Sequence, residues 1–130
     1  GVRLVGSEMC IRDRRIPALL EAATEQTARV EERVRGNLAT LHELLDADPN
    51  GLVSVLRAEG GWNVLLRVPS VIDENEMVLK LIAEHGLTGQ PGYFFDMTSN
   101  GYLAVSLLPE PEVFRQGICA VLATVEALLA

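Results

Sequence analysis

Few residues of this chain could do chemistry on their own, and those that could lie far apart. The two histidines, His42 and His85, have no serine, cysteine or carboxylate partner at a recognisable catalytic spacing. Lys80 falls on the exposed side of a predicted helix, whereas a lysine that forms a Schiff base needs a desolvated pocket. The sequence also lacks a glycine-rich phosphate loop and a cluster of metal ligands. We therefore expect no catalytic, cofactor-binding or metal-binding residue in this chain.

An aromatic run, Tyr93-Phe94-Phe95, follows a corner that is predicted at Gln90-Pro91-Gly92. Proline fixes φ there, and glycine can take the positive φ that other residues avoid. The three rings could pack on the core, since aromatic side chains bury large areas. They could instead form the apolar wall of a ligand pocket. Asp96 and Asn100, which come next, are expected to form turns.

The composition argues against several functions. With 48% hydrophobic and 22% charged residues, the 130-residue chain is typical of one globular domain. Its net charge of -7 and single lysine argue against a nucleic-acid partner, because phosphate binding needs clustered basic residues. No run approaches the ~20 apolar residues of a membrane span. Cys10 and Cys119 fit neither a disulfide framework nor a zinc site, and Cys119 is expected to be a buried thiol in the last helix. We expect a cytoplasmic protein with no nucleic-acid or membrane partner.

The segment 48–130 predicts a small α+β domain in which helices pack on one sheet. Apolar runs bounded by glycine or proline predict strands at 52–57, 62–68, 87–88 and 102–108. Asp73 and Glu76 form a capping box, which begins a helix predicted over 74–85. A last helix is predicted over 110–128.

A long helix is predicted ahead of this domain. Apolar residues recur at steps of three and four from Ile16 to Leu45, as in one stripe of an α-helix. Pro17 suits the first turn, turn residues after Asp46 end the helix, and Gly36-Asn37 marks a bend or a close contact. About thirty residues at ~1.5 Å each give ~45 Å, which is more than the small domain spans. Such a helix either crosses into another domain or belongs to a coiled coil or bundle.

The first fifteen residues, GVRLVGSEMCIRDRR, fit neither a helix nor a strand, and they lack the apolar core of a signal peptide. They look like the translated read-through of a sequencing adapter, of which VGSEMCIRDR is the recurrent form. We therefore expect residues 1–14 to be no native part of the protein. The chain would then begin at a break in a longer gene, with its true N-terminus upstream.

The stretch from Gly86 to Phe114 resembles the C-terminal small domain of the class I/II, fold-type-I aminotransferases, which depend on pyridoxal phosphate. Members of this family carry a Pro-Gly corner followed by a phenylalanine, a strand of the pattern G-x-x-R-x-S and a terminal helix. Here that strand is Gly101-Tyr102-Leu103-Ala104-Val105-Ser106. The strand that begins with Gly60-Gly61-Trp62 shares the likeness, which covers residues 16–130.

The resemblance implies a domain organisation and a reaction. Residues 15–47 would form an interdomain helix, and residues 48–130 a mobile lid domain on the substrate side. The parent enzyme would be a homodimer that transfers an amino group between an amino acid and a 2-oxo acid. Pyridoxal phosphate and its lysine would belong to a large domain upstream, so that this chain alone would be inactive.

One departure from the family pattern concerns substrate binding. The resemblance implies an arginine where Ala104 stands, which would hold the substrate α-carboxylate through two hydrogen bonds. Arg67, on the predicted strand face shared with Asn63 and Leu65, is our candidate replacement, although an exposed residue at a strand end can also lack any such role. Alternatively, the substrate lacks an α-carboxylate, or the missing domain supplies the arginine.

The resemblance also implies that the aromatic run closes over the active site, so Tyr93 and Phe94 join Arg67 as predicted substrate-binding residues. Two other functions stay open. Related pyridoxal-phosphate lyases and decarboxylases share the fold, and a fold does not fix a reaction. A non-catalytic α/β regulatory module that binds a small ligand would explain the acidic composition and the absence of catalytic groups, but not the long first helix.

Overall fold

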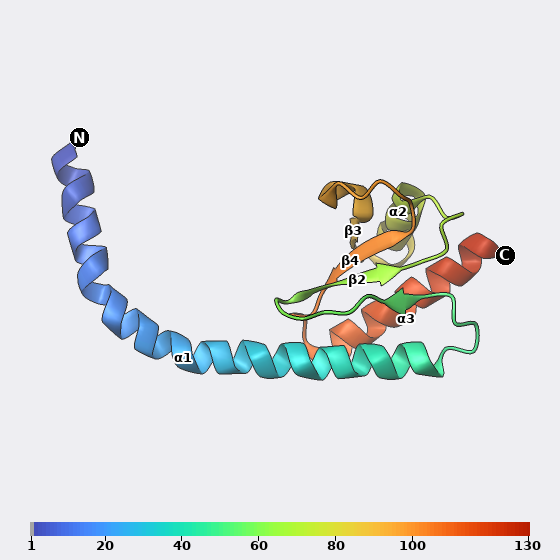
Figure 1. The fold of residues 1–130 in the computed structure, drawn as a ribbon, viewed down its shortest axis with the longest axis horizontal. Coiled ribbons are helices and arrows are strands. Elements are labelled where there is room, and N and C mark those ends of the chain that lie inside the picture. Colours follow the sequence, from blue (N-terminus) through green and yellow to red (C-terminus); the bar gives the residue numbers. More distant parts are fainter. Residues whose placement is uncertain (1) are drawn as a thin grey trace. The chain divides into compact units, whose positions relative to one another are not determined.

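The computed structural model describes the backbone of residues 2–130 and the side chains of residues 14–130 (Figure 1). The chain divides into two compact units, one that ends at Glu32 and one that comprises Arg33–Ala130. The described part of the first unit is helical, and the second unit combines helices with one antiparallel sheet. The predicted architecture, a long N-terminal helix and then a small sheet with packed helices, is confirmed.

Helix α1 covers Val2–Ala47 and therefore begins well before the predicted start at Ile16. The expectation that the first fifteen residues form no helix is wrong for residues 2–15. These residues contain no proline and include leucine, methionine, glutamate and arginine, which are good helix formers even without an apolar stripe. Pro17 lies inside the helix, not in its first turn, and removes one N–H donor from the helical ladder. Gly1 lies outside the described residues, and the foreign origin of residues 1–14 stays a prediction.

Within the first unit, every side chain from residue 14 to Glu32 is exposed. The apolar stripe of this part includes Ile16, Leu19 and Leu20, while Arg29 pairs with Glu25 at 2.7 Å. An exposed pair of this i,i+4 type contributes about 0.3–0.5 kcal/mol. This part of α1 is therefore held mainly by the helix propensity of its residues.

In the second unit, α1 is fixed by a buried asparagine. The Asn37 side chain is 1% exposed, and its Nδ2 donates to the carbonyl oxygens of Leu107 and Pro109, both at 2.8 Å. Leu41, one turn further on, is fully buried in the core. The close contact predicted at Gly36-Asn37 is thus made by Asn37, whereas the space around Gly36 is open.

The sheet has the strand order β1-β2-β4-β3, and all neighbouring strands are antiparallel. The strands are β1 Ser54–Val55, β2 Asn63–Arg67, β3 Gln90–Pro91 and β4 Tyr102–Ser106. Strands β2 and β4 lie where they were predicted. The strand predicted at 52–57 is shorter in the structure, where β1 covers only Ser54–Val55. Its pairing with β2 ends at the hydrogen bond from the Leu56 N–H to Leu65 O at 2.9 Å, and the chain then turns at Gly60-Gly61.

Strand β3 covers Gln90–Pro91, whereas a short strand was predicted at 87–88. The predicted position is therefore wrong. The N–H of Leu87 still bonds to Leu81 O at 3.3 Å, so this residue belongs to the end of the preceding helix. Gln90 and Pro91 pair with Ala104 and Leu103 instead. A proline is tolerated there because β3 is an edge strand.

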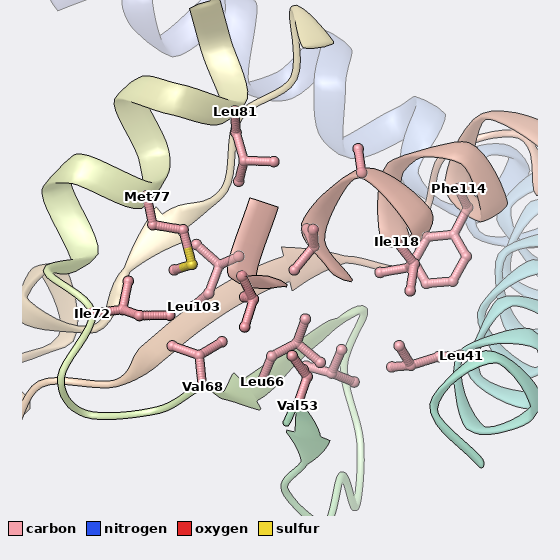
Figure 2. Close-up of a cluster of buried hydrophobic side chains, with 14 of the residues drawn as sticks. Leu41, Val53, Leu66, Val68, Ile72, Met77, Leu81, Leu103, Phe114 and Ile118 are labelled. Atoms are coloured by element: carbon pink, nitrogen blue, oxygen red, sulfur yellow. The ribbon is translucent and has the colours of Figure 1, made fainter. Parts of the chain in front are cut away.

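Helices α2, Glu74–His85, and α3, Pro111–Leu129, share one core with a face of the sheet (Figures 1 and 2). Its buried side chains come from the sheet, from both helices and from α1. They include Leu66 and Leu103 of the strands, Met77 and Leu81 of α2, Phe114 and Ile118 of α3, and Leu41 of α1. Burial of each large apolar side chain contributes about 1.5–3 kcal/mol, so this core is the main source of stability.

The ends of α2 follow the predicted signals. The Asp73 carboxylate accepts a hydrogen bond from the Glu76 N–H at 2.9 Å, and Gly86 ends the helix in the left-handed region. In α3, however, Cys119 is exposed, so the expected buried thiol is wrong. Cys119 follows the buried Ile118 by one residue, and a rotation of about 100° per residue turns it away from the core.

Candidate functional site

The sheet face opposite the core carries two of the residues singled out from the sequence, Arg67 and Ala104. In β2, Val64 and Leu66 are buried while Asn63 and Arg67 are exposed, so the alternation is as predicted. The register pairs Arg67 with Tyr102 and Leu65 with Ala104. Because residues directly opposite in an antiparallel pair point to the same face, Arg67, Leu65, Tyr102 and Ala104 share this face.

Ala104 is 9% exposed and lies between Leu65 of β2 and Gln90 of β3. Arg67 is its diagonal neighbour, and such residues lie about 7–8 Å apart between Cα atoms. An arginine side chain can span this distance. The position of Arg67 is therefore compatible with the predicted replacement, while its role stays a prediction.

Arg67 differs from four other basic side chains of the second unit. Arg33, Arg57, Lys80 and Arg115 each pair with a glutamate at 2.7–3.5 Å. Among the residues that the structure describes, Arg67 has neither an ion pair nor a hydrogen bond. It thus presents an uncompensated positive charge at the end of β2.

A pocket of about 630 Å³ contains Arg67. Its lining is mostly polar and is formed by Leu52, Ser54, Arg67, Val68, Pro69, Ser70, Ser99, Asn100 and Tyr102. The Asn100 side chain donates to Ile72 O at 3.1 Å, which fixes one wall. The pocket includes neither Ala104 nor Tyr93 and Phe94, so the structure does not bring the three predicted substrate-binding residues into one cavity.

The aromatic run lies in a 3₁₀ helix, η1, which covers Gly92–Phe95. Tyr93, Phe94 and Phe95 are 50%, 64% and 52% exposed, so packing on the core, the first of the two interpretations, is wrong. The rings of Tyr93 and Phe94 meet edge to face with centroids 5.0 Å apart. An exposed aromatic surface of this kind is compatible with a binding surface, the second interpretation.

Gly92 does not take the positive φ expected of it. A Cβ at this position would lie 2.7 Å from Tyr102 Cβ and 3.1 Å from Glu74 Oε1, so glycine is required for close approach. The positive φ of the corner occurs at Asp96 instead, with a value of 56°. Gly92 thereby brings the aromatic run next to the first residue of β4.

Glu74 is the site residue that sequence reasoning missed. It is 2% exposed, and its Oε1 accepts from the N–H groups of Gly101 and Tyr102 at 2.9 and 2.8 Å. Its Oε2 accepts from the Tyr93 N–H at 3.3 Å. The only sequence signal is an acidic residue in the first turn of α2, which is equally expected of a solvated residue.

Tyr102 connects the predicted residues. It faces Arg67 across β2 and β4, and through Gly92 and Glu74 it adjoins the start of the aromatic run. Arg67 and Tyr93 are 26 positions apart (93 − 67) in the sequence. In the structure they lie on two sides of Tyr102. This neighbourhood offers a cation, hydroxyls and exposed aromatic rings.

The remaining titratable candidates form no site. His42 and His85 are exposed, and Lys80 pairs with Glu84 at 2.7 Å along α2. The described residues do not fit a pyridoxal phosphate site, because the one lysine lies on a helix surface beside a carboxylate. Within residues 14–130 no group of histidine, cysteine and acidic side chains could hold a metal ion. Among the described helices, none has the length and apolar character needed to cross a bilayer.

No protein-family model matches the chain, and no curated protein matches it. Its fold, however, is aminotransferase-like: solved structures that it matches are aminotransferases. A PLP-dependent aminotransferase from Streptococcus suis matches with a TM-score of 0.68 and 23% identity over 78% of this chain and 26% of that one. Tyrosine aminotransferase from Leishmania infantum has a TM-score of 0.67 and 19% identity over 81% and 26% of the two chains.

LysN, an α-aminoadipate aminotransferase from Thermus thermophilus, has a TM-score of 0.63 and 21% identity, over 81% of this chain and 27% of its own. The chain thus spans about a quarter of the length of the structures that it matches. At these identities the likeness establishes the fold alone.

Proposed function

We propose that this chain is the C-terminal part of a pyridoxal-phosphate-dependent aminotransferase, which transfers an amino group between an amino acid and a 2-oxo acid. The observation that carries the proposal is a fold shared over 78–81% of this chain but only 26–27% of the matching aminotransferases. A cofactor held upstream, in a large domain, agrees with the absence of a suitable lysine among the described residues. The whole protein would be a cytoplasmic homodimer.

In this proposal, residues 15–47 are the interdomain helix and residues 48–130 are the lid on the substrate side. Tyr93 and Phe94 form an apolar wall for the substrate, and Arg67 supplies a cation for its carboxylate. The support is their exposure on one part of the second unit, beside Tyr102. Their task is to bind and orient the substrate and to exclude water.

A small-ligand-binding regulatory module is the second candidate. It is favoured by the pocket around Arg67, which residues of the second unit form among themselves. A lyase or decarboxylase of the same fold would differ from the aminotransferase in residues outside this chain. The upstream sequence therefore separates these functions better than the chain itself does.

The first experiment is a long read through the genomic DNA upstream of Ile16, followed by expression of the complete reading frame. We expect a large domain with a Schiff-base lysine, and amino transfer from an amino acid to a 2-oxo acid. A start codon just upstream, without such a domain, would overturn the enzyme assignment. In the complete enzyme, Arg67→Ala should raise KM for the amino-acid donor at least tenfold.

The matched control is Arg57→Ala, at an exposed arginine that pairs with Glu59 at 3.2 Å outside the pocket. This variant should keep the KM of the unaltered enzyme. An unchanged KM in the Arg67 variant would contradict its role in substrate binding.

A further inference from the structure

Two asparagine–glycine pairs occur in the chain, Asn50-Gly51 and Asn100-Gly101. An asparagine in this setting can modify itself, because glycine has no side chain to keep its backbone nitrogen from reaching the neighbouring amide carbon. The two pairs carry the same reactive groups but lie in different surroundings. A difference in their reactivity beyond that of their flanking residues must therefore come from the fold.

The second pair, Asn100-Gly101, is held at both of its reacting groups. The Asn100 Nδ2 donates to Ile72 O at 3.1 Å, which fixes the side-chain amide. The Gly101 N–H donates to Oε1 of the buried Glu74 at 2.9 Å, so the attacking nitrogen is engaged. Gly101 is itself buried, and a Cβ there would lie 2.7 Å from Val68 O. Ring closure at this pair thus requires both hydrogen bonds to break at a tightly packed position.

The first pair, Asn50-Gly51, is open. Both residues are exposed, in the connection between α1 and β1 (Figure 1). The Asn50 backbone N–H donates to Asp48 Oδ1 at 3.2 Å. Among the residues that the structure describes, neither the Asn50 side chain nor the Gly51 N–H has a hydrogen-bond partner. Apart from the neighbouring residues, no atom lies within 4 Å of a Cβ placed on Gly51, so the reacting groups can approach each other freely.

We propose that Asn50 is a site of spontaneous deamidation, from which the fold protects Asn100. The Gly51 nitrogen attacks Cγ of Asn50, the new N–Cγ bond closes a succinimide ring, and the Cγ–Nδ2 bond breaks. The proton of the Gly51 N–H leaves with Nδ2 as ammonia. Water then opens the ring at Cγ, which gives aspartate, or at the α-carbonyl carbon, which gives isoaspartate. Neither step is an oxidation or a reduction, and water is the only co-reactant.

The modification changes the junction between α1 and the sheet. Either product adds a negative charge close to Asp46 and Asp48, which repel it. Isoaspartate also adds one methylene group to the backbone, because the chain then runs through Cβ and Cγ. The modified chain should keep its core, since Asn50 lies outside it.

The test incubates the 130-residue chain at neutral pH, folded in buffer and unfolded in guanidinium chloride, and follows both asparagines by peptide mass spectrometry. In the folded chain we expect Asn50 to deamidate at least about tenfold faster than Asn100, because the protected pair reacts only after local opening. In denaturant the two rates should agree within about threefold, since both pairs are then exposed. A ratio of the two rates in the folded chain no greater than the ratio in denaturant would overturn the proposal.

Glu74→Gln tests the source of the protection. Without the carboxylate the Gly101 N–H is held less firmly, so Asn100 should deamidate at least about fivefold faster than in the unaltered chain. Asn37→Ala is the matched control, because it removes buried hydrogen bonds just beyond the other end of β4 and leaves the bond to Gly101 in place. Its Asn100 should react within about twofold of the unaltered rate.

An equal rise in both variants would show that overall stability protects Asn100, and would overturn the assignment to Glu74. The comparison of the two asparagines within the unaltered chain does not depend on the folding of either variant. The assay needs neither cofactor nor upstream domain, so its failure leaves the proposed function standing.

Discussion

Single residues hold the neighbourhood of Tyr102 together, and Glu74 contributes most. Its buried carboxylate lies at the N-terminus of α2, where the helix dipole favours a negative charge. Three backbone N–H groups from two segments point at it. One side chain thus fixes both the aromatic run and the start of β4 to the same helix.

Glu74→Gln tests this arrangement with almost no change in volume. The amide loses the negative charge and turns its NH₂ group toward backbone donors, which leaves at least one buried N–H unsatisfied. We expect a loss of about 2–3 kcal/mol in the free energy of unfolding, measured with urea. Glu76→Gln, at an exposed residue of the same turn, is the control and should change it by less than about 0.5 kcal/mol. Equal values for the two variants would contradict the role of Glu74.

Gly92 makes a second residue-scale prediction, based on close approach. In Gly92→Ala, the new methyl group would meet the Cβ of Tyr102 at 2.7 Å, so the corner or β4 must shift. Overpacking of this kind costs about 1–3 kcal/mol of stability. Gly60→Ala, where no atom lies within 4 Å of the added Cβ, is the control and should be close to neutral. Thermal unfolding of both variants measures the difference, and an equally neutral Gly92 variant would show that the corner can relax.

At the scale of elements, the accuracy of the sequence predictions follows the range of the interactions. The start of α2 at Asp73 and the alternation in β2 depend on neighbouring residues, and both were predicted. The position of β3 depends on β4, which lies further along the chain, and its prediction was wrong. The exposure of the aromatic run depends on the same strand, and of its two interpretations only packing on the core was wrong. The pocket around Arg67 likewise depends on the pairing of β1, β2 and β4, which no local pattern encodes.

The connection between α1 and the end of β4 carries the element-scale prediction. Asn37→Ala would leave the carbonyls of Leu107 and Pro109 without their side-chain donor and would open a small cavity. We expect a loss of about 2–3 kcal/mol in the free energy of unfolding. Asn75→Ala, at an exposed position of α2, is the control. A small, equal effect of both substitutions on urea unfolding would show that the two bonds add little.

At the scale of the whole molecule, stability is concentrated in the second unit. The buried core draws on Leu41 and on residues further along the chain, whereas the side chains from residue 14 to Glu32 are all exposed. The exposed stripe that includes Ile16, Leu19 and Leu20 is a surface of the kind that another domain or chain covers. In the proposed parent enzyme, the large domain would do so.

Two truncations test this division. A chain of residues 33–130 retains Asn37, Leu41 and the core, so we expect its free energy of unfolding to stay within about 1 kcal/mol of that of the 130-residue chain. It should also self-associate less, as measured by sedimentation, because the exposed stripe is gone. A chain of residues 43–130 lacks both Asn37 and Leu41 and should be largely unfolded. The core would lose a fully buried leucine, and the segment after β4 would lose the hydrogen bonds that Asn37 donates to it. If the chain of residues 33–130 unfolds, or if the chain of residues 43–130 is stable, the contacts that stabilise the fold lie elsewhere.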